Sequence, residues 1–291
     1  MRSEERVAGV ALTHPDRRVF PSAGVTKLEL ARYYESVAER MLPHVIDRPL
    51  MILRCPDGEG EPGFYQKHVT GRVPPGLARV TIPDPRGGPA STYLRIRDVR
   101  GLVALVQMDV IEIHVWGAVA RRLERPDRVV FDLDPGAGVT WARVVSGAHA
   151  VRDELERRGL VSFVKTTGGK GVHVVAPITP GPAWSEVRAF ARDVAETLAR
   201  AAPGKFVARS GEARRHGRIF ADYLRNGRGA TWVAPYSARA RAGAPVSMPV
   251  SWDDLTAVNK PLRWTVRTVA GMFGRDPWEG MRGVRQSLRS A

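Results

Sequence analysis

The sequence predicts an α+β fold with mixed or antiparallel sheets and flanking helices rather than a doubly wound parallel sheet. Strand-like and helix-like apolar stretches are interspersed along the 291 residues without a regular strand–helix–strand alternation. A hydrophobic content of 43% is ordinary for a globular protein. The length suits one large domain or two lobes around a cleft. No internal repeat or low-complexity linker interrupts the pattern.

The first part of the chain is predicted to begin with a capped helix. Thr26-Lys27-Leu28-Glu29 is a capping box, and apolar residues at helical spacing follow it as far as Met41. A shorter helix is predicted at 102–106. The predicted strands lie at 50–53, 93–96 and 110–116. The last of these alternates in polarity and is therefore expected to be half-buried, whereas the Gly- and Pro-rich segment 57–63 is expected to be a connection.

The second part of the chain is predicted to contain four strands and three helices. The predicted strands lie at 129–134, 162–165, 172–176 and 218–223. The predicted helices lie at 141–158, 184–202 and 262–272. A basic tail follows Trp278.

Charge and cysteine content narrow the classes of function. Lys plus Arg is 45 against 30 for Asp plus Glu, which gives a net charge of +15 and favours a polyanionic partner such as nucleic acid. An arginine-rich composition from a high-GC genome would raise the charge in the same way. The single cysteine, Cys55, excludes an internal disulfide and a cysteine-rich zinc site. No apolar run could span a membrane and the N-terminus lacks a signal-peptide core, which fits a cytoplasmic protein.

Two aspartates at the end of a strand are the most informative feature. In Val129-Val130-Phe131-Asp132-Leu133-Asp134-Pro135, alternation places both carboxylates on the same face of the strand. Because neighbouring carboxylates repel each other, a divalent metal is the best counter-charge. Alone, the motif could equally be a turn opener or a helix cap.

Asp222 is the third acidic candidate, because it also ends an apolar strand. A neighbouring strand could bring it beside Asp132 and Asp134, and three such carboxylates are the usual equipment for two metal ions in phosphoryl transfer. Asp222 alone is better explained as a turn residue at a strand end.

A glycine-rich turn joins two predicted strands at Lys165-Thr166-Thr167-Gly168-Gly169-Lys170-Gly171-Val172-His173. Its backbone N–H groups could form an anion-binding nest, Lys170 adds charge, and His173 could reach the same phosphates. The turn is not a Walker A loop, because Gly171 stands where that motif needs Ser or Thr. A plain glycine hairpin explains it about equally well.

Several other residues are candidates for binding, and most of them also have a purely structural explanation. His114 lies on a strand and would contact phosphate or metal, or be a hydrogen-bonded core residue. Phe64 and Tyr65 would stack on an unpaired base or pack in a core. Arg17 and Lys27 flank a turn and would form a basic pocket, although exposed surface charges explain them better. Arg239 would grip a triphosphate.

Together these motifs resemble the polymerase domain of bacterial ligase D, the ATP-dependent ligase of non-homologous end joining, within the archaeo-eukaryotic primase superfamily. The resemblance implies a primase-polymerase domain at about residues 10–280 and a basic C-terminal tail at 281–291. The matching stretches occur in family order. They are His14-Pro15-Asp16-Arg17 with Val19-Phe20-Pro21, Thr26-Lys27, Phe64-Tyr65-Gln66-Lys67-His68, Ile113-His114-Val115-Trp116, Phe131-Asp132-Leu133-Asp134-Pro135, Phe163 to His173, Phe220-Ala221-Asp222-Tyr223, and Ala234-Pro235-Tyr236-Ser237 with Arg239.

The resemblance also implies roles for individual residues. Asp132, Asp134 and Asp222 match the catalytic, metal-binding carboxylates, with two Mn²⁺ or Mg²⁺ ions expected per active site. The positions that match the nucleotide-binding site are His114, Thr167, Gly168, Gly169, Lys170, His173 and Arg239. The positions that match DNA-binding residues are Arg17, Lys27, Phe64, Tyr65 and Lys67.

Three positions depart from the usual family pattern. Thr167 replaces a serine and keeps the hydroxyl. Tyr65 replaces a phenylalanine and can still stack on a base. Arg17 replaces a more common lysine and can bind phosphate with two parallel hydrogen bonds.

The resemblance implies a template-directed nucleotidyltransferase that fills gaps or extends 3′ ends at DNA breaks, with ribonucleotides accepted. The expected partners are gapped or broken DNA, especially 5′-phosphorylated, an NTP or dNTP, a separate DNA ligase and an end-binding protein such as Ku. No ATP-ligase lysine motif or nuclease module is present, so a stand-alone polymerase or an excised domain in the cytoplasm, at the nucleoid, is expected. The alternatives are a metal-dependent nuclease or phosphoesterase and a non-catalytic DNA-end-binding protein.

Overall fold

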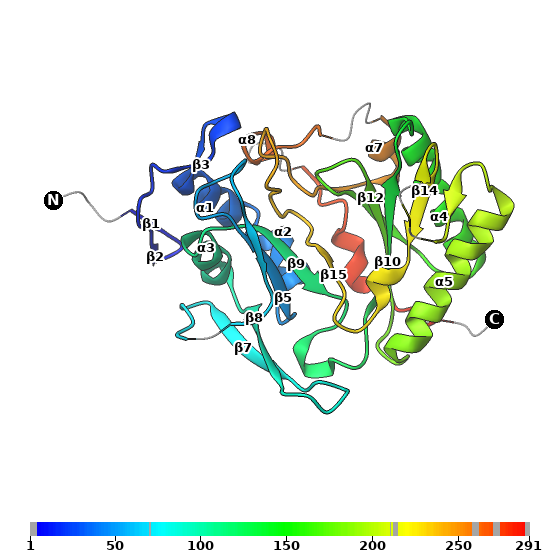
Figure 1. Cartoon of the computed structure of the whole chain (residues 1–291), viewed down its shortest axis with the longest axis horizontal. Helices are drawn as coiled ribbons and strands as arrows, with labels where there is room; N and C mark the ends of the chain where they lie inside the picture. Colours follow the sequence, from blue (N-terminus) through cyan, green and yellow to red (C-terminus); the bar gives the residue numbers. More distant parts are fainter. Residues whose placement is uncertain are drawn as a thin grey trace. The chain divides into compact units, whose positions relative to one another are not determined.

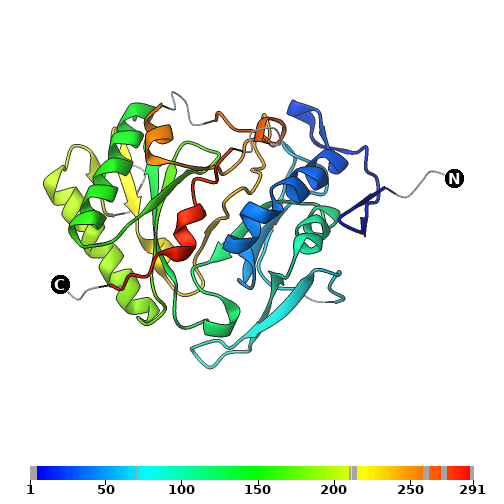
Figure 2. The same ribbon diagram turned by 180° about the vertical axis from the view of Figure 1, so that it is seen from behind.

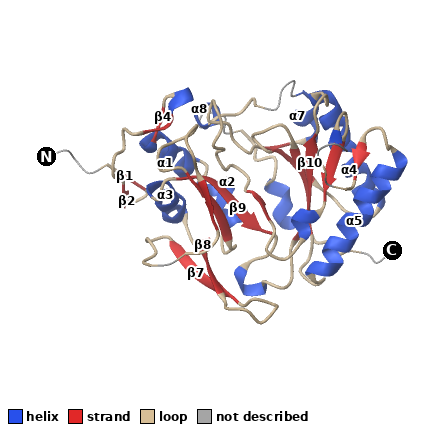
Figure 3. Ribbon diagram, viewed as in Figure 1, coloured by secondary structure: helices blue, strands red, loops and turns tan. Residues whose placement is uncertain are grey.

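The structure, a computed structural model, divides the chain into two compact units (Figure 1). It describes residues 5–69, 71–209, 211, 215–257, 262–269 and 274–288. Unit 1 comprises Met1–Arg121, Thr231–Ser247 and Trp264–Gly274, and unit 2 comprises Arg122–Ala230, Met248–Arg263 and Arg275–Ala291. Both units combine strands with helices, which confirms the predicted α+β class (Figure 3).

Unit 1 is built on a four-stranded antiparallel sheet. The elements of the unit are β1 (Arg6–Val7), β2 (Val10–Ala11), β3 (Arg18–Phe20), η1 (Pro21–Ala23), β4 (Val25–Thr26), α1 (Lys27–Ser36), α2 (Ala38–Val45), β5 (Leu50–Arg54), β6 (Phe64–Gln66), β7 (Leu77–Ile82), β8 (Ser91–Ile96), α3 (Val99–Gln107), β9 (Val110–Trp116), β15 (Thr231–Val233) and α8 (Val266–Val269), and η2 (Ala120–Arg122) leads into unit 2. The sheet order is β15-β9-β5-β6, and α1 packs on α3, which contacts β9.

Helix α1 begins where the capping box predicts. The Thr26 hydroxyl accepts the Glu29 N–H at 3.2 Å, and the Glu29 carboxylate accepts the Thr26 N–H at 2.7 Å. Two of the donors that a helix start leaves unpaired are thereby satisfied. The apolar face that follows, including Leu30 and Tyr34, is buried.

Unit 2 is built on a six-stranded sheet in the order β13-β14-β10-β12-β11-β16. Its elements are β10 (Arg128–Pro135), α4 (Trp141–Arg157), β11 (Phe163–Thr166), β12 (Val172–Pro177), α5 (Trp184–Ala201), β13 (Phe206–Val207), β14 (Ile219–Asp222), η3 (Leu224–Asn226), β16 (Pro249–Val250), α7 (Trp252–Ala257) and η4 (Glu279–Gly283). The pairs β10–β12, β10–β14 and β11–β12 are antiparallel, and only β13–β14 is parallel among the described strand pairs of this sheet.

The helices α4 and α5 pack on each other and on the central strands of this sheet (Figures 1 and 2). Val129, Phe131 and Leu133 of β10 share one face of the strand and are fully buried. Asp132 and Asp134 project from the opposite face. The apolar alternation of β10 thus leaves the two carboxylates on the face that the sequence predicts.

Two sequence predictions need correction. The strand at 110–116 is not half-buried, because all seven residues of β9 are buried, including Glu112 and His114. The helix predicted at 262–272 begins only at Val266, since the backbone at 264–266 bonds to residues 244–246 instead. Residues 270–273 lie outside the described residues. No described helix is long and apolar enough to cross a membrane.

A buried asparagine continues the edge of β10 where β14 ends. β14 pairs with Asp132–Pro135 only, and the backbone of Val130 beyond it bonds to the side chain of Asn226. The amide oxygen accepts the Val130 N–H at 2.8 Å, and the amide nitrogen donates to the Val130 carbonyl at 2.7 Å. Asn226 is 2% exposed, so water cannot replace these bonds.

Asn226→Ala is expected to lower the free energy of unfolding by about 2–4 kcal/mol, because both polar groups of Val130 stay buried without partners. Urea denaturation followed by circular dichroism measures the change. A loss below about 0.5 kcal/mol would show that the side chain does not support the strand.

Candidate active site

One level of the six-stranded sheet carries a row of ionisable side chains. Strand register places Asp132 of β10 directly opposite Asp222 of β14 on one side and His173 of β12 on the other. Lys165 of β11 lies opposite His173. Because adjacent strands are about 4.8 Å apart, directly opposed side chains are neighbours on the same face. Four residues that are far apart in the sequence therefore form one continuous polar row.

Arginines neutralise the carboxylates of this row. Nε of Arg225 lies 3.1 Å from the Asp222 carboxylate and 3.4 Å from that of Asp132, so a single guanidinium group faces both. Arg215 forms an ion pair with Asp134 and stacks over the Phe220 ring at 4.6 Å. The three aspartates that the sequence singled out thus lie on one face, with Asp132 and Asp222 close enough to share a cation.

The three carboxylates have different electrostatic environments. Burial acts against ionisation of Asp132, but His173, Arg225 and Lys165 outweigh it and hold its pKa well below the usual range. Burial and the charge of Asp132 raise the pKa of Asp134. Burial, followed by the charge of Asp132 and opposed by Arg225, raises the pKa of Asp222. For Asp134 and Asp222, burial and the neighbouring Asp132 charge together outweigh the arginines, so the pKa of each carboxyl is raised.

His173 is a neutral, buried member of the row. Burial, together with the charge of Lys165, lowers its pKa to about 4, although Asp132 opposes the shift. Its Nε2 lies 3.4 Å from the Asp132 carboxylate, and its Nδ1 is buried without a hydrogen-bond partner among the described residues. A buried nitrogen in this state suits a site that a ligand completes.

The donor set fits a hard divalent cation in kind. Among the described residues, no three histidine, cysteine, aspartate or glutamate side chains are already gathered as metal ligands. Asp132, Asp134 and Asp222 nevertheless offer carboxylate oxygens on one face, which are the donors that Mg²⁺ and Mn²⁺ prefer. Arg225 now supplies the positive charge that faces Asp132 and Asp222, a charge that a divalent cation held by these carboxylates would supply instead.

The glycine-rich turn lies directly against the carboxylate strand. A Cβ on Gly171 would lie 2.3 Å from the Leu133 carbonyl oxygen of β10, so only glycine permits this approach. Gly168 has φ +65°, which also favours glycine. The N–H and hydroxyl of Thr167 donate to the Gly171 carbonyl at 3.1 and 3.0 Å. Gly169 is buried within the turn, whereas the side chain of Lys170 is exposed.

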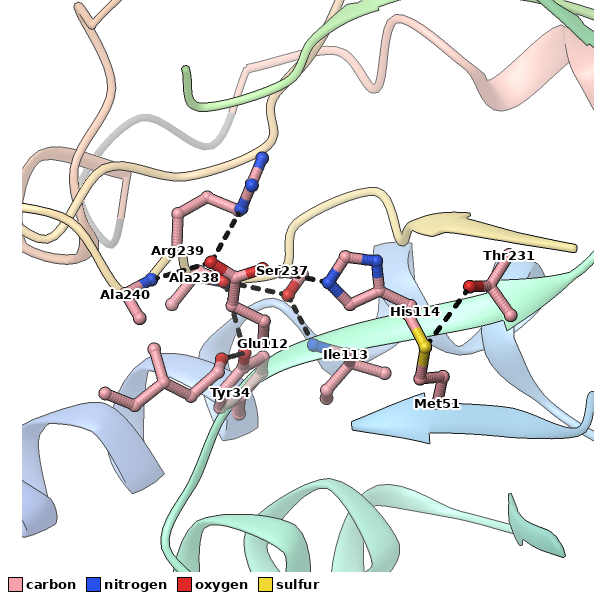
Figure 4. Close-up of polar contacts among 11 residues, drawn as sticks. Tyr34, Met51, Glu112, Ile113, His114, Thr231, Ser237, Ala238, Arg239 and Ala240 are labelled. Carbon is pink, nitrogen blue, oxygen red and sulfur yellow. Dashed lines mark hydrogen bonds and ion pairs between the residues drawn. The ribbon is translucent and has the colours of Figure 1, made fainter. Parts of the chain in front are cut away.

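Two further candidates meet in unit 1 on a shared carboxylate (Figure 4). Glu112 Oε2 lies 2.8 Å from His114 Nε2, and Glu112 Oε1 lies 3.0 Å from Arg239 Nε. The N–H of Ala240 also donates to Oε1 at 3.0 Å. The structure therefore brings together His114 and Arg239, two of the positions that match the nucleotide-binding site, and does so through Glu112, which the sequence analysis did not name as a site residue.

The pKa of Glu112 lies well below that of an ordinary glutamate, so the carboxylate is ionised at neutral pH. Burial alone would raise its pKa, but the hydrogen bond with His114 and the charge of Arg239 lower it to about 2. Its side chain is only 4% exposed.

The aromatic pair and Lys67 lie on the surface of unit 1. Phe64 and Tyr65 on β6 are 47% and 57% exposed, so they are not core aromatics. The Tyr65 ring meets the His114 ring edge-on, with the centroids 5.8 Å apart. Two exposed aromatic rings beside the exposed Lys67 suit stacking on bases and contact with phosphate.

Arg17 and Lys27 meet at one carboxylate. Arg17 forms an ion pair with Asp109, and Lys27 Nζ lies 3.5 Å from the same carboxylate. Lys27 is 2% exposed, so the explanation of these residues as exposed surface charges is wrong for Lys27. Burial, followed by Arg17, lowers the pKa of Lys27 even though Asp109 opposes the shift. The structure thus brings Arg17 and Lys27 together on the Asp109 carboxylate, and the basic pocket stays a prediction.

A family model described as LigD, primase-polymerase domain, matches residues 26–278. The chain belongs to this family. Among solved structures, the polymerase domain of Mycobacterium tuberculosis ligase D in complex with DNA aligns with a TM-score of 0.86 and 33% identity, covering 94% of this chain and 97% of that one.

Curated relatives of this LigD primase-polymerase chain are longer multifunctional proteins. The multifunctional non-homologous end joining protein LigD of Pseudomonas aeruginosa is 40% identical over 99% of this chain. The bifunctional non-homologous end joining protein LigD of Bacillus subtilis is 27% identical over 88% of it. The chain spans only 35% and 41% of the lengths of these two relatives.

Sequence reasoning missed five residues of the candidate sites in the two units, and each is a partner of a residue that was found. They are Glu112, Lys165, Arg225, Asp109 and Arg215, the last of which pairs with Asp134 across 81 residues. Glu112 and Arg225 could have been found from local spacing. Glu112 lies two residues from His114 on the same face of a strand, and Arg225 lies three residues after Asp222 in a turn. Lys165 and Asp109 could not, because their contacts depend on sheet register and on a pairing across 92 residues.

The depressed pKa of Glu112 predicts an acid-dependent stability. The group stabilises the fold fully above the unfolded-state pKa of 4.5, and this contribution declines as the pH falls through the folded-state value of about 2. In Glu112→Gln this contribution is absent. The difference in unfolding free energy between the parent and the variant is therefore expected to shrink by up to about 1.4 kcal/mol per pH unit below 4.5. Urea titrations at pH 7, 4 and 3 measure it, and a constant difference would contradict the assignment.

Proposed function

We propose that this chain is a template-directed nucleotidyltransferase that adds nucleotides to a DNA 3′-hydroxyl at gaps or broken ends. In this reaction the 3′-oxygen bonds to the α-phosphorus of an NTP or dNTP, the bond to the β-phosphate breaks, pyrophosphate leaves and the hydroxyl loses its proton. Membership of the LigD primase-polymerase family supports the reaction class. The chain spans about a third of its longer relatives, so nuclease or ligase functions of those proteins are not extended to it.

The placement of Asp132 directly opposite Asp222, with Asp134 on the same face, carries the proposal. Phosphoryl transfer builds up negative charge on the transferred group, and catalysis consists mainly of positioning and charge stabilisation. Two divalent cations held by these carboxylates, with manganese the favoured metal, would supply positive charge at the reacting phosphate. Without a cation, Arg225 and Arg215 pair with these carboxylates and hold them on one face.

His114, Arg239 and the glycine-rich turn are proposed to bind the nucleotide. A guanidinium group matches phosphate oxygens with parallel hydrogen bonds, and an imidazole can donate to them. The exposed Lys170 adds a mobile positive charge on unit 2, and the buried Nδ1 of His173 offers a polar contact in the carboxylate row. Thr167, Gly168 and Gly169 shape the turn.

The DNA is proposed to contact unit 1. Phe64 and Tyr65 expose their ring surfaces for stacking on template bases, and Lys67 lies beside them. Arg17 and Lys27 are proposed to bind the 5′-phosphate at a gap or recessed end, where two adjacent cations suit a dianion. The net charge of +15 favours DNA at low salt.

The cellular setting is part of the same proposal. Gap filling leaves a nick, so a separate DNA ligase would seal the product, and an end-binding protein such as Ku would hold the ends. A cytoplasmic protein at the nucleoid would meet these partners. On the family resemblance, ribonucleotides are proposed to be accepted as substrates.

Asp132→Asn is expected to lower primer extension in Mn²⁺ by at least about a hundredfold, because the amide removes a charged ligand from the centre of the carboxylate row. Binding to a 5′-phosphorylated gapped duplex, measured by fluorescence anisotropy, is expected to stay within about threefold of the parent. Asp253→Asn, at an exposed aspartate on α7 of the same unit, is the matched control. Unchanged extension by Asp132→Asn would exclude the assigned site.

The same assay separates the rival functions. A labelled primer that lengthens only with added nucleotide indicates a polymerase. Shortening without nucleotide would indicate a nuclease or phosphoesterase, and tight gap binding without any change in primer length would indicate a non-catalytic end-binding protein.

A further inference from the structure

The Glu112 carboxylate lies at the centre of a polar network that no proposed contact with substrate explains (Figure 4). It joins β9 to the loop after β15, and its bond to the N–H of Ala240 spans 128 residues of sequence. Both of its oxygens are used, one by His114 and the other by Arg239 and the Ala240 N–H. A single buried carboxylate thus fixes two side chains from separate segments.

The surrounding backbone holds this network rigidly. The Ile113 N–H donates to the Ser237 hydroxyl at 2.9 Å, and the Ala234 N–H donates to the Ile113 carbonyl at 2.8 Å. The Ala238 N–H donates to the Tyr34 hydroxyl at 3.1 Å. The loop that carries Arg239 is therefore bonded to β9 and to α1 on either side of Glu112.

Of the three side chains in this network, that of Glu112 is the most deeply buried. The side chain of Glu112 is 4% exposed, whereas those of His114 and Arg239 are 11% and 13% exposed. In Figure 4 the end of the Arg239 guanidinium group points away from Glu112. The carboxylate lies behind the other two groups, so it supports them rather than reaching a ligand itself.

The carboxylate also determines where the histidine proton lies. An ionised carboxylate can only accept a hydrogen bond, so His114 Nε2, at 2.8 Å, must carry the proton. In the neutral ring Nδ1 is then the acceptor. Protonation of Nδ1 makes an imidazolium that Glu112 stabilises, which turns that nitrogen into a donor for an anion.

We propose that Glu112 is a positioning residue that holds His114 and Arg239 as one preassembled anchor for the nucleotide triphosphate. The inference rests on the proposed function, in which His114 and Arg239 bind the nucleotide, and it assigns Glu112 as the residue that positions both. A preassembled pair binds phosphate with less loss of side-chain freedom than two independent side chains. A buried ion pair adds little to stability compared with apolar residues, so stability alone is a weak reason for Glu112 to be there.

Glu112→Gln tests the proposal with almost no change in shape. The amide would donate to His114 Nε2, which forces the proton onto Nδ1, and it removes the charge that faces Arg239. In primer extension with GTP at fixed Mn²⁺, KM for GTP is expected to rise about tenfold or more, with kcat within about threefold of the parent.

A spectroscopic measurement separates positioning from a merely structural role. In protein labelled with ¹⁵N-histidine, the neutral His114 ring is expected to carry its proton on Nε2 in the parent and on Nδ1 in Glu112→Gln. The parent spectrum alone can overturn the proposal, because an Nδ1-protonated ring in the parent contradicts the bond to Glu112.

Combined variants test whether Glu112 acts through its two partners. Adding Glu112→Gln to a His114→Ala/Arg239→Ala variant is expected to cause no further rise in KM. An undiminished rise in that background would overturn the proposal, because Glu112 would then act on the nucleotide by another route.

Two further variants guard against a folding defect. Glu112→Gln/Arg239→Gln removes both buried charges, so it avoids an unpaired guanidinium, and it is expected to keep the raised KM. Glu154→Gln is the matched control, because the Glu154 side chain is 3% exposed, close to the 4% of Glu112, and is ion-paired with Arg157 and Arg158 at the end of α4, yet it belongs to no proposed binding group. Its KM is expected to match the parent.

These experiments distinguish failure of the proposed function from failure of the positioning role of Glu112. If the parent protein adds no nucleotide, the proposed function fails, while the histidine spectrum still decides the link between Glu112 and His114. If the parent is active and Glu112→Gln leaves both KM and the spectrum unchanged, the proposed function stands and the positioning role is overturned.

Discussion

The antiparallel pairing of β10 with β14 and β12 is the constraint on which the candidate active site depends. It places Asp132 opposite both Asp222 and His173, although these residues come from three separate strands. Because side chains alternate along a strand, a shift of one residue would turn Asp132 and Asp134 toward the helices and leave no acidic row. Asn226 and the close approach of Gly171 both hold β10 in place at this level.

Carboxylates in both units are paired with cations, from a distant segment in some cases and from a neighbouring turn in others. Arg225 faces Asp132 and Asp222, Arg239 faces Glu112, and Arg17 and Lys27 share Asp109. Burying such groups is costly unless they are paired. The arrangement therefore costs stability that a purely apolar core would not, which is typical of residues kept for binding and catalysis rather than for folding.

The sequence predicted the parts of this protein that depend on local pattern. The capping box at Thr26, the strand with Asp132 and Asp134, and the two long helices follow from spacing alone and were confirmed. The predictions that were wrong concern segments whose structure depends on distant contacts. The alternation at 110–116 suggested a solvent-facing side, but a loop more than a hundred residues later covers it. Likewise, the helix does not begin at 262, because the backbone at 264–266 bonds to residues 244–246, which its own composition does not reveal.

The chain leaves unit 1 after Arg121 and returns to it at Thr231, and this has a consequence for synthesis on the ribosome. β9 pairs with β15, so one edge of that strand has no partner until more than a hundred further residues have been translated. An unpaired edge of this kind can recruit other strands and cause aggregation. The nascent N-terminal segment is therefore vulnerable for several seconds at ordinary elongation rates of about 5–20 residues per second, a period in which a chaperone would find exposed apolar surface to bind.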